Sequence, residues 1–124
     1  MKKFILYGFS EDEILRIQKT VKFISSNIQY LTFDDSDFNR TLGDVIKDKK
    51  FNTNGEYSCG EKVVIFQNIV SKEVDIYFKL LRKNLGKNII FATVTDTSIN
   101  MEISHLFDEF KQERDYFRGN RKNK

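Results

Sequence analysis

The chain has 124 residues, of which 40% are hydrophobic and 31% are charged, a composition that predicts one globular domain and excludes a disordered chain. The net charge is +3, but residues 118–124 hold four basic side chains and no acid, so residues 1–117 carry a charge of −1. We therefore expect a nearly neutral domain over residues 1–117, a disordered basic tail, and no globally basic nucleic-acid-binding surface. The single cysteine and the lack of an apolar run of ~20 residues predict a cytoplasmic protein without disulfides or a membrane span.

The first half of the chain predicts a strand, a helix, a second strand and a second helix. Residues 3–9 form an apolar run typical of a buried strand. Ser10 and Glu13 then have the spacing of a capping box, and apolar residues three and four positions apart continue the helix to about residue 26. Residues 28–33 predict the second strand, and an aspartate-rich turn precedes a helix that contains Phe38, Leu42, Val45 and Ile46.

The second half repeats this order 61 residues later, because residues 4–10 align with residues 65–71 and residues 28–35 with residues 89–96. Strands are predicted at 62–69 and 88–94, and a helix from Ser71 ends at the expected capping glycine, Gly86. A cap cluster at 95–98 opens a last helix that runs to about Phe117. The polar segment 47–61 joins the halves, and we expect it to be mobile or to contain a small hairpin.

Alternation of strands and helices predicts a small, mainly parallel sheet with helices on both faces, in the order 2-1-3-4. The carboxyl ends of parallel strands share one edge, and ligands bind there at the switch in strand order. Two helices would begin at that edge, which favours an anion, although nearby acids would repel one and Ser10 and Ser71 are also ordinary helix caps. The candidate ligand-edge residues from this argument are Gly8, Phe9, Ser10, Asn68, Ser71, Thr95 and Asp96.

Familiar catalytic patterns are missing from the sequence. It has no glycine-rich phosphate loop, and its aspartates follow the wrong strands for a phosphoacceptor cluster. Cys59 and His105 are far apart in the sequence, and no His, Cys or Asp grouping has metal-ligand spacing. We therefore predict no catalytic residue, no cofactor and no metal, and the sequence leaves enzymatic activity open.

Two motifs resemble those of a known family. Gly8-Phe9-Ser10 before an acidic helix start resembles its first motif, and residues 92–113 resemble its second. The family is that of small bacterial proteins grouped as domain of unknown function 3783, and the resemblance covers about residues 4–114. It implies no activity, cofactor or catalytic residue, and it adds Asn100 to the candidate residues. Within the second motif the matching positions are Ala92, Thr95, Asn100, Leu106 and Glu113, with Met101 where the family has tryptophan.

These observations favour a binding or regulatory module over an enzyme. One alternative is a small-ligand protein or enzyme that uses the cleft at the strand ends. Another is a nucleic-acid accessory that acts through residues 118–124, although the missing aromatic residues make nucleic acid an unfavoured partner. A protein partner or a homodimer could also form through the last helix, where Phe110, Tyr116 and Phe117 predict an apolar patch.

Overall fold

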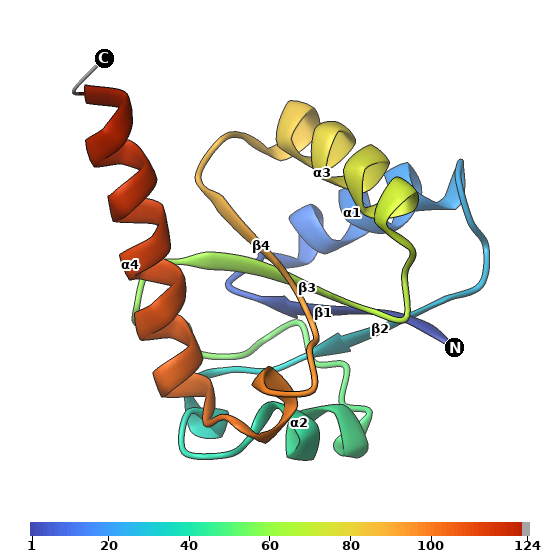
Figure 1. The fold of residues 1–124 in the computed structure, drawn as a ribbon. Coiled ribbons are helices and arrows are strands. Elements are labelled where there is room, and N and C mark those ends of the chain that lie inside the picture. Colours follow the sequence, from blue (N-terminus) through green and yellow to red (C-terminus); the bar gives the residue numbers. More distant parts are fainter. Residues whose placement is uncertain (123–124) are drawn as a thin grey trace.

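Four strands form one mixed sheet in the order β2-β1-β3-β4. The computed structural model describes residues 1–122, and from residue 113 onward it describes the backbone alone. The predicted single-domain α/β fold and its strand order are confirmed. The strands are β1 (Lys2–Tyr7), β2 (Ile28–Thr32), β3 (Lys62–Gln67) and β4 (Ile89–Thr93), as labelled in Figure 1.

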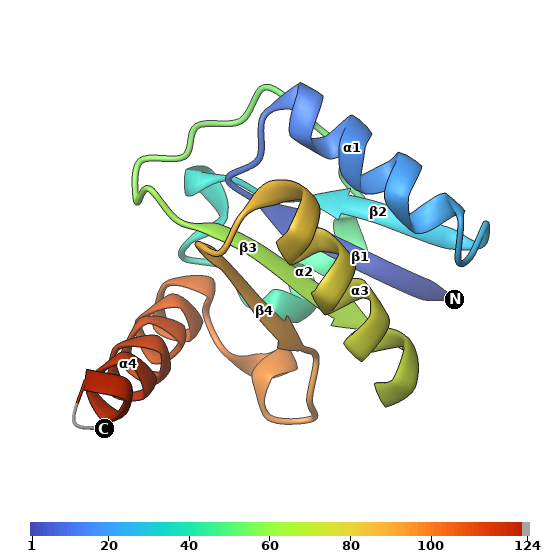
Figure 2. The same cartoon turned by 90° about the horizontal axis from the view of Figure 1, so that it is seen from above.

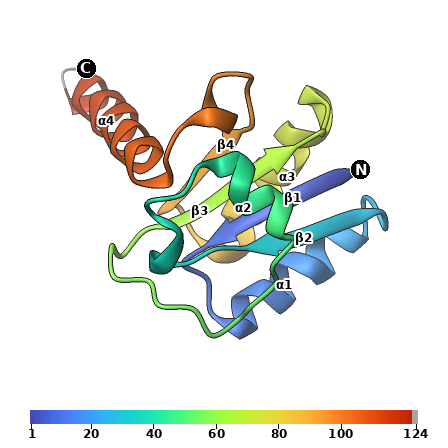
Figure 3. The same ribbon diagram turned by 90° about the horizontal axis from the view of Figure 1, so that it is seen from below.

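Two helices cover each face of this sheet. The helices are α1 (Glu11–Lys22), α2 (Leu42–Asp48), α3 (Ser71–Leu85) and α4 (Ile103–Lys122), with short 3-10 turns η1 (Asp35–Asp37) and η2 (Ser98–Asn100). α1 and α3 lie side by side on one face (Figure 2), and α2 lies on the other (Figure 3). Side chains alternate along β1, so Phe4 packs with α1 and α3 while Ile5 packs with α2 and α4.

The central strand pair, β1 and β3, is antiparallel. β1–β2 and β3–β4 are parallel pairs, so the sheet is mainly parallel, as predicted. However, β1 and β2 end at one end of the sheet, whereas β3 and β4 end at the opposite end. The prediction that all candidate residues share one edge is therefore wrong.

The reason lies in the segment 49–61, which begins and ends at the same end of the sheet. Near its start, Lys50 accepts a backbone hydrogen bond of 2.8 Å from Thr32, the last residue of β2. At its end, the carbonyl group of Glu61 lies against Gly8, just beyond β1. The chain therefore enters β3 where β1 ends, and β3 runs in the opposite direction. The segment has neither a strand nor a hairpin.

The antiparallel pair relates the two halves by an approximate two-fold axis. Phe4 pairs with Phe66 in the sheet, and Thr41, before α2, forms an isolated antiparallel bridge with Glu102, before α4. Thr41 and Glu102 are 61 residues apart, the spacing of the sequence repeat. The repeat is thus a real structural repeat, but its halves are related by rotation and not by continuation of a parallel sheet.

The spacing of the repeat shortens to 60 residues in the first turn of each half. Gly8 and Asn68 both have a left-handed backbone, with φ of 86° and 59°. The caps that follow are Ser10 for α1 and Val70 for α3. Ser10 forms the predicted capping box with Glu13. The cap role predicted for Ser71 is wrong, because Ser71 is already the first residue of α3 and Val70 makes no side-chain cap bond.

The last helix begins later than the sequence predicts. Thr95 and Ser98 exchange hydrogen bonds in the turn that leads into η2, and α4 begins only at Ile103. α4 continues to Lys122, but side chains from residue 113 onward lie outside what the structure describes. The apolar patch predicted with Tyr116 and Phe117 and the role predicted for the basic tail therefore stay predictions. No helix in the described part of the chain is long and apolar enough to cross a membrane.

Candidate functional site at the open end of the sheet

The first group of candidate residues is built into the fold at the end of β1. Gly8 has no room for a side chain, because a Cβ atom there would lie 2.1 Å from the carbonyl oxygen of Glu61. Phe9 is 1% exposed in the core, and Ser10 caps α1 with a bond of 3.2 Å from the Glu13 amide. These three residues have structural roles here.

A side-chain network holds the segment 49–61 over this end. The Tyr7 hydroxyl donates to Asp35 at 2.5 Å, and the Cys59 thiol donates to the Tyr7 oxygen at 3.3 Å. The Ser58 amide donates to the other Asp35 oxygen at 2.8 Å. Burial, with the hydrogen bond to Asp35, raises the pKa of Tyr7 well above its usual range. Burial also opposes ionisation of Asp35, but the bonds from Ser58 and Tyr7 outweigh it and lower the Asp35 pKa.

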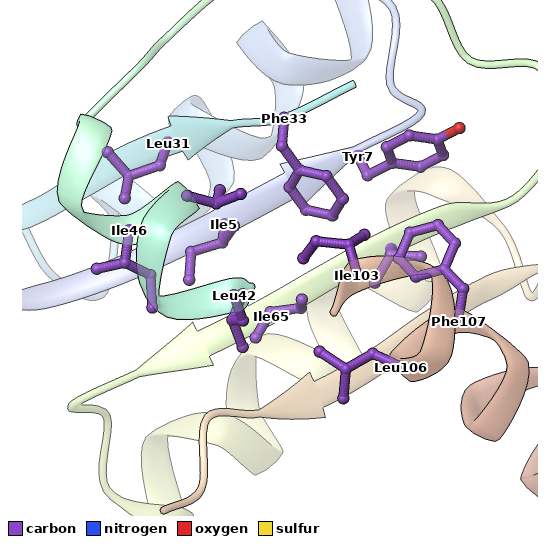
Figure 4. Packing of buried hydrophobic residues seen from close by; sticks show 12 residues of the cluster. Ile5, Tyr7, Leu31, Phe33, Leu42, Ile46, Ile65, Ile103, Leu106 and Phe107 are labelled. Atoms are coloured by element: carbon purple, nitrogen blue, oxygen red, sulfur yellow. The ribbon is translucent and has the colours of Figure 1, made fainter. Parts of the chain in front are cut away.

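The aromatic ring of Tyr7 is the centre of the core on the α2 and α4 face. It packs edge-to-face against Phe107 at 4.9 Å between ring centroids and lies 5.2 Å from Phe33. Figure 4 shows these rings beside Leu42 and Ile103, between the sheet and the helices. Cys59 therefore donates a hydrogen bond to Tyr7 at the margin of this core. His105 lies on α4 with its side chain 67% exposed. The structure does not join them into a nucleophilic pair.

An ion cluster around the buried Asp37 closes the same end beside α2. Asp37 is 3% exposed and accepts from Lys50 at 2.9 Å and from Arg40 at 3.2 Å. Burial disfavours the charged carboxylate, yet Lys50, the Asp34 amide and Arg40 together lower the pKa of Asp37. Arg40 also pairs with Asp48 at the end of α2. The cluster ties η1, α2 and the segment 49–61 together.

The second group of candidates lies at the opposite end, where β3 and β4 finish. The Asn68 side chain donates to the backbone oxygen of Met1 at 3.1 Å. Ser71, Thr95 and Asp96 are exposed, and Asn100 is exposed in η2. The structure thus keeps Asn68, Ser71, Thr95 and Asp96 at one end and separates them from Gly8, Phe9 and Ser10.

An aromatic groove lies near this second end, between α3 and β4. Its volume is about 350 Å³. The Phe91 ring stacks on Phe66 at 6.1 Å and meets Phe78 edge-to-face at 4.9 Å. The Arg82 guanidinium lies 5.4 Å from the centroid of Phe78, a cation–π contact. The groove is lined by Phe66, Val74, Asp75, Phe78, Phe91, Ala92 and Thr93.

The groove adjoins a free sheet edge. β4 pairs only with β3 among the described residues. Its sequence, Ile89–Thr93, contains no charge and no proline, although proteins commonly use both to protect exposed edges. In Figure 1, α4 stands beside the end of the sheet where β3 begins. Thr93, at the other end of β4, is exposed. Val70, at the start of α3, adds an apolar side chain that is 62% exposed.

A comparison with known protein families gives a match over the second half of the sheet. The model of a family described as Domain of unknown function (DUF3783) matches residues 62–117. The match covers 56 of the 124 residues, so it shows a likeness of residues 62–117 to this family. The resemblance is confirmed there, including its second motif, whereas Gly8-Phe9-Ser10 lies outside the matched residues. No curated protein and no solved structure matches the chain.

The DUF3783 segment corresponds to one structural half, from β3 into α4. Every residue that lines the groove lies inside it, and so does the free strand. The closing segment 49–61 lies outside it. The matched segment therefore holds the open end of the sheet, and the rest of the chain supplies the closed end.

The sequence indicates the apolar nature of Val74, Phe78 and Phe91 but not their exposure. An apolar run in a strand predicts burial on both faces only where helices cover both faces along its length. The signal that could have found the groove was the predicted order 2-1-3-4, which puts the uncharged fourth strand at an edge. Among the described residues, no group of three His, Cys, Asp or Glu side chains could hold a metal ion.

Proposed function

We propose that this protein is a binding module that holds an extended polypeptide segment against β4, with side chains of that segment in the α3–β4 groove. The observation that carries the proposal is the combination of an unpaired, uncharged edge strand with a half-exposed aromatic groove beside it. An added strand would gain backbone hydrogen bonds from the edge and selectivity from the groove. Exposed apolar surface of this kind commonly marks an interaction site.

The chemistry near the groove favours binding over catalysis. Its lining has one carboxylate, Asp75, one hydroxyl, Thr93, and otherwise apolar side chains. A catalytic nucleophile needs an activating base within hydrogen-bond reach, and the lining residues include no histidine, cysteine or lysine. The groove therefore offers contact area and orientation.

Selection of peptides tests this function. We expect a phage library of random 12-residue peptides, panned on the full chain, to enrich segments with alternating apolar residues, because alternate side chains of an added strand face the groove. Phe78→Ala should weaken the selected peptides by about tenfold, since it removes a half-buried ring from the groove. Phe23→Ala is the matched control, because Phe23 is 92% exposed at the end of α1. Equal binding by both variants would refute the proposal.

A small apolar molecule is the second candidate ligand, because the groove volume of about 350 Å³ falls in the range of known small-molecule pockets. A thermal-shift screen of aromatic fragments separates the two ideas. A stabilising fragment that requires Phe78 would support small-ligand binding, since a ligand of the native state raises the melting temperature. Fragments without effect, combined with bound peptides, would favour the polypeptide.

A further inference from the structure

The lining of the groove has one charged residue, Asp75. Asp75 is exposed and lines the groove from the second turn of α3. It forms no ion pair among the described residues, in contrast to its neighbour Glu73, which pairs with Lys2 at 2.5 Å and accepts from Tyr77 at 3.2 Å. A carboxylate beside an apolar groove is a ready partner for a cation carried by whatever fills the groove.

Several cations on α3 flank the groove without lining it. Lys72 and Lys79 stand three residues before and four residues after Asp75 and are exposed, and neither forms an ion pair with Asp75 among the described residues. Arg82 lies over the outer ring, Phe78, about two helical turns beyond Asp75. The planar guanidinium group stacks on the ring, and the aliphatic stem of Arg82 can cover apolar surface beside it. Among the residues that line the groove, Asp75 is the only charged one. The lining itself therefore favours positive charge in a ligand.

We propose that the partner is an extended basic–aromatic segment, with an aromatic or large aliphatic side chain in the groove and a lysine or arginine that meets Asp75. This inference rests on the proposed function and names the chemistry of its ligand. Alternate residues of a strand lie on one face, about 6.6 Å apart. An apolar residue and a basic residue two positions away can therefore reach the rings and the carboxylate together.

Two synthetic peptides test the proposal directly on the full chain. The first, fluorescein-STVFVKVTS, carries phenylalanine with lysine two residues later; the second has glutamate in place of that lysine. We expect fluorescence anisotropy to show the lysine peptide binding about tenfold more tightly, because one fully changed charge contact is worth roughly 1.4 kcal/mol. Equal affinity of the two peptides would overturn the charge assignment.

Asp75→Lys should reverse the preference, so that the glutamate peptide binds more tightly. Asp108→Lys is the matched control, because Asp108 is an exposed acid on α4 and the change in net charge is the same. It should keep the preference for the lysine peptide. A preference that follows net charge, with both variants alike, would overturn the inference, and circular dichroism verifies that each variant is folded.

The outcomes also separate this inference from the function on which it rests. Peptides that bind through Phe78 without any charge preference would keep the binding module and overturn the basic–aromatic partner. If no peptide binds in a way that depends on Phe78, both the binding module and the basic–aromatic partner are overturned. Preference for the lysine peptide at 150 mM salt that Asp75→Asn reduces would support both, because a contact with one carboxylate survives moderate screening better than diffuse attraction.

Discussion

The two outer strands of the sheet end in equivalent threonines with opposite environments. Thr32 ends β2 and is 2% exposed; its hydroxyl accepts from the Asn52 amide at 2.7 Å and its own amide donates to Lys50. Thr93 ends β4, 61 residues later, and is exposed at the rim of the groove. The same position in the repeat is therefore closed in one half and open in the other.

This difference teaches that closure is a property of the segment 49–61 and not of the repeated unit. The segment is held through Tyr7, Asp35 and Asp37, all in the first half. The DUF3783 half has no equivalent cover among the described residues. The two halves thus have similar strand ends. The segment 49–61 covers the end of β2, whereas the end of β4 is accessible.

The largest expected effect comes from disturbing the closed end at Gly8. Gly8→Ala adds a Cβ atom 2.1 Å from the Glu61 oxygen, at a φ of 86°. We expect a loss of about 3 kcal/mol in the free energy of unfolding, from the clash and the left-handed backbone together. Urea unfolding measures it.

Gly60→Ala is the control for that change, because Gly60 has a φ of 72° but open space around its Cβ position. It should cost only the conformational part, about 1 kcal/mol. If both variants lose the same stability, close contact with Glu61 is not what makes this end rigid.

The ion cluster at Asp37 ranks second. Asp37→Ala removes a buried carboxylate that Lys50, Arg40 and the Asp34 amide all contact. We expect a loss of about 2–3 kcal/mol, because Lys50 loses its ion-pair partner, the Asp34 amide loses its acceptor, and Arg40 keeps only Asp48 as an ion-pair partner. Asp48→Ala, at the exposed side of the same cluster, should change stability very little in the same urea titration. A larger effect at Asp48 than at Asp37 would contradict this account.

Acid should weaken the closed end in the same way. The pKa of Asp37 and that of Asp35 lie below their ordinary value of 3.8 in the folded protein. The unfolded chain then binds more protons as the pH falls, so this stabilisation is complete above pH 3.8 and is lost as the pH falls below it toward the folded pKa values. Urea midpoints between pH 7 and pH 2.5 should fall less steeply for Asp37→Asn. Parallel curves for both proteins would show that Asp37 does not contribute.

Strand order, helix faces and the capping box at Ser10 could be predicted from the sequence, because periodicity and cap spacing are local. The direction of β3 could not. It depends on contacts such as Asp35 to Ser58 and Gly8 to Glu61, which join residues far apart in the chain. Periodicity reports which face of a strand is apolar, and it is the same for either direction. The candidate residues were therefore placed at the right strand ends but at the wrong common edge.

The Tyr7 hydroxyl should control access to the loop thiol. Tyr7→Phe keeps the ring in its aromatic cluster but removes the bonds to Asp35 and Cys59. We expect a loss of about 1–2 kcal/mol, because a hydrogen bond to a charged group is worth that much. Labelling of Cys59 by a thiol reagent should become faster as the segment 49–61 loosens. Tyr30→Phe, in the other core, should leave the labelling rate unchanged. If both variants label equally faster, the Tyr7 hydroxyl does not hold the segment 49–61 in place.

The smallest effects test the comparison most sharply, because the two threonines allow the same substitution in both halves. Thr32→Val removes the acceptor of the Asn52 amide at the closed end, so we expect a loss of about 1 kcal/mol. Thr93→Val should change stability by close to zero, because Thr93 is exposed and valine is well suited to a strand. Urea unfolding of both variants at one pH measures the difference. If Thr93→Val costs as much as Thr32→Val, then the β4 end is covered in solution and the groove is not available to a partner.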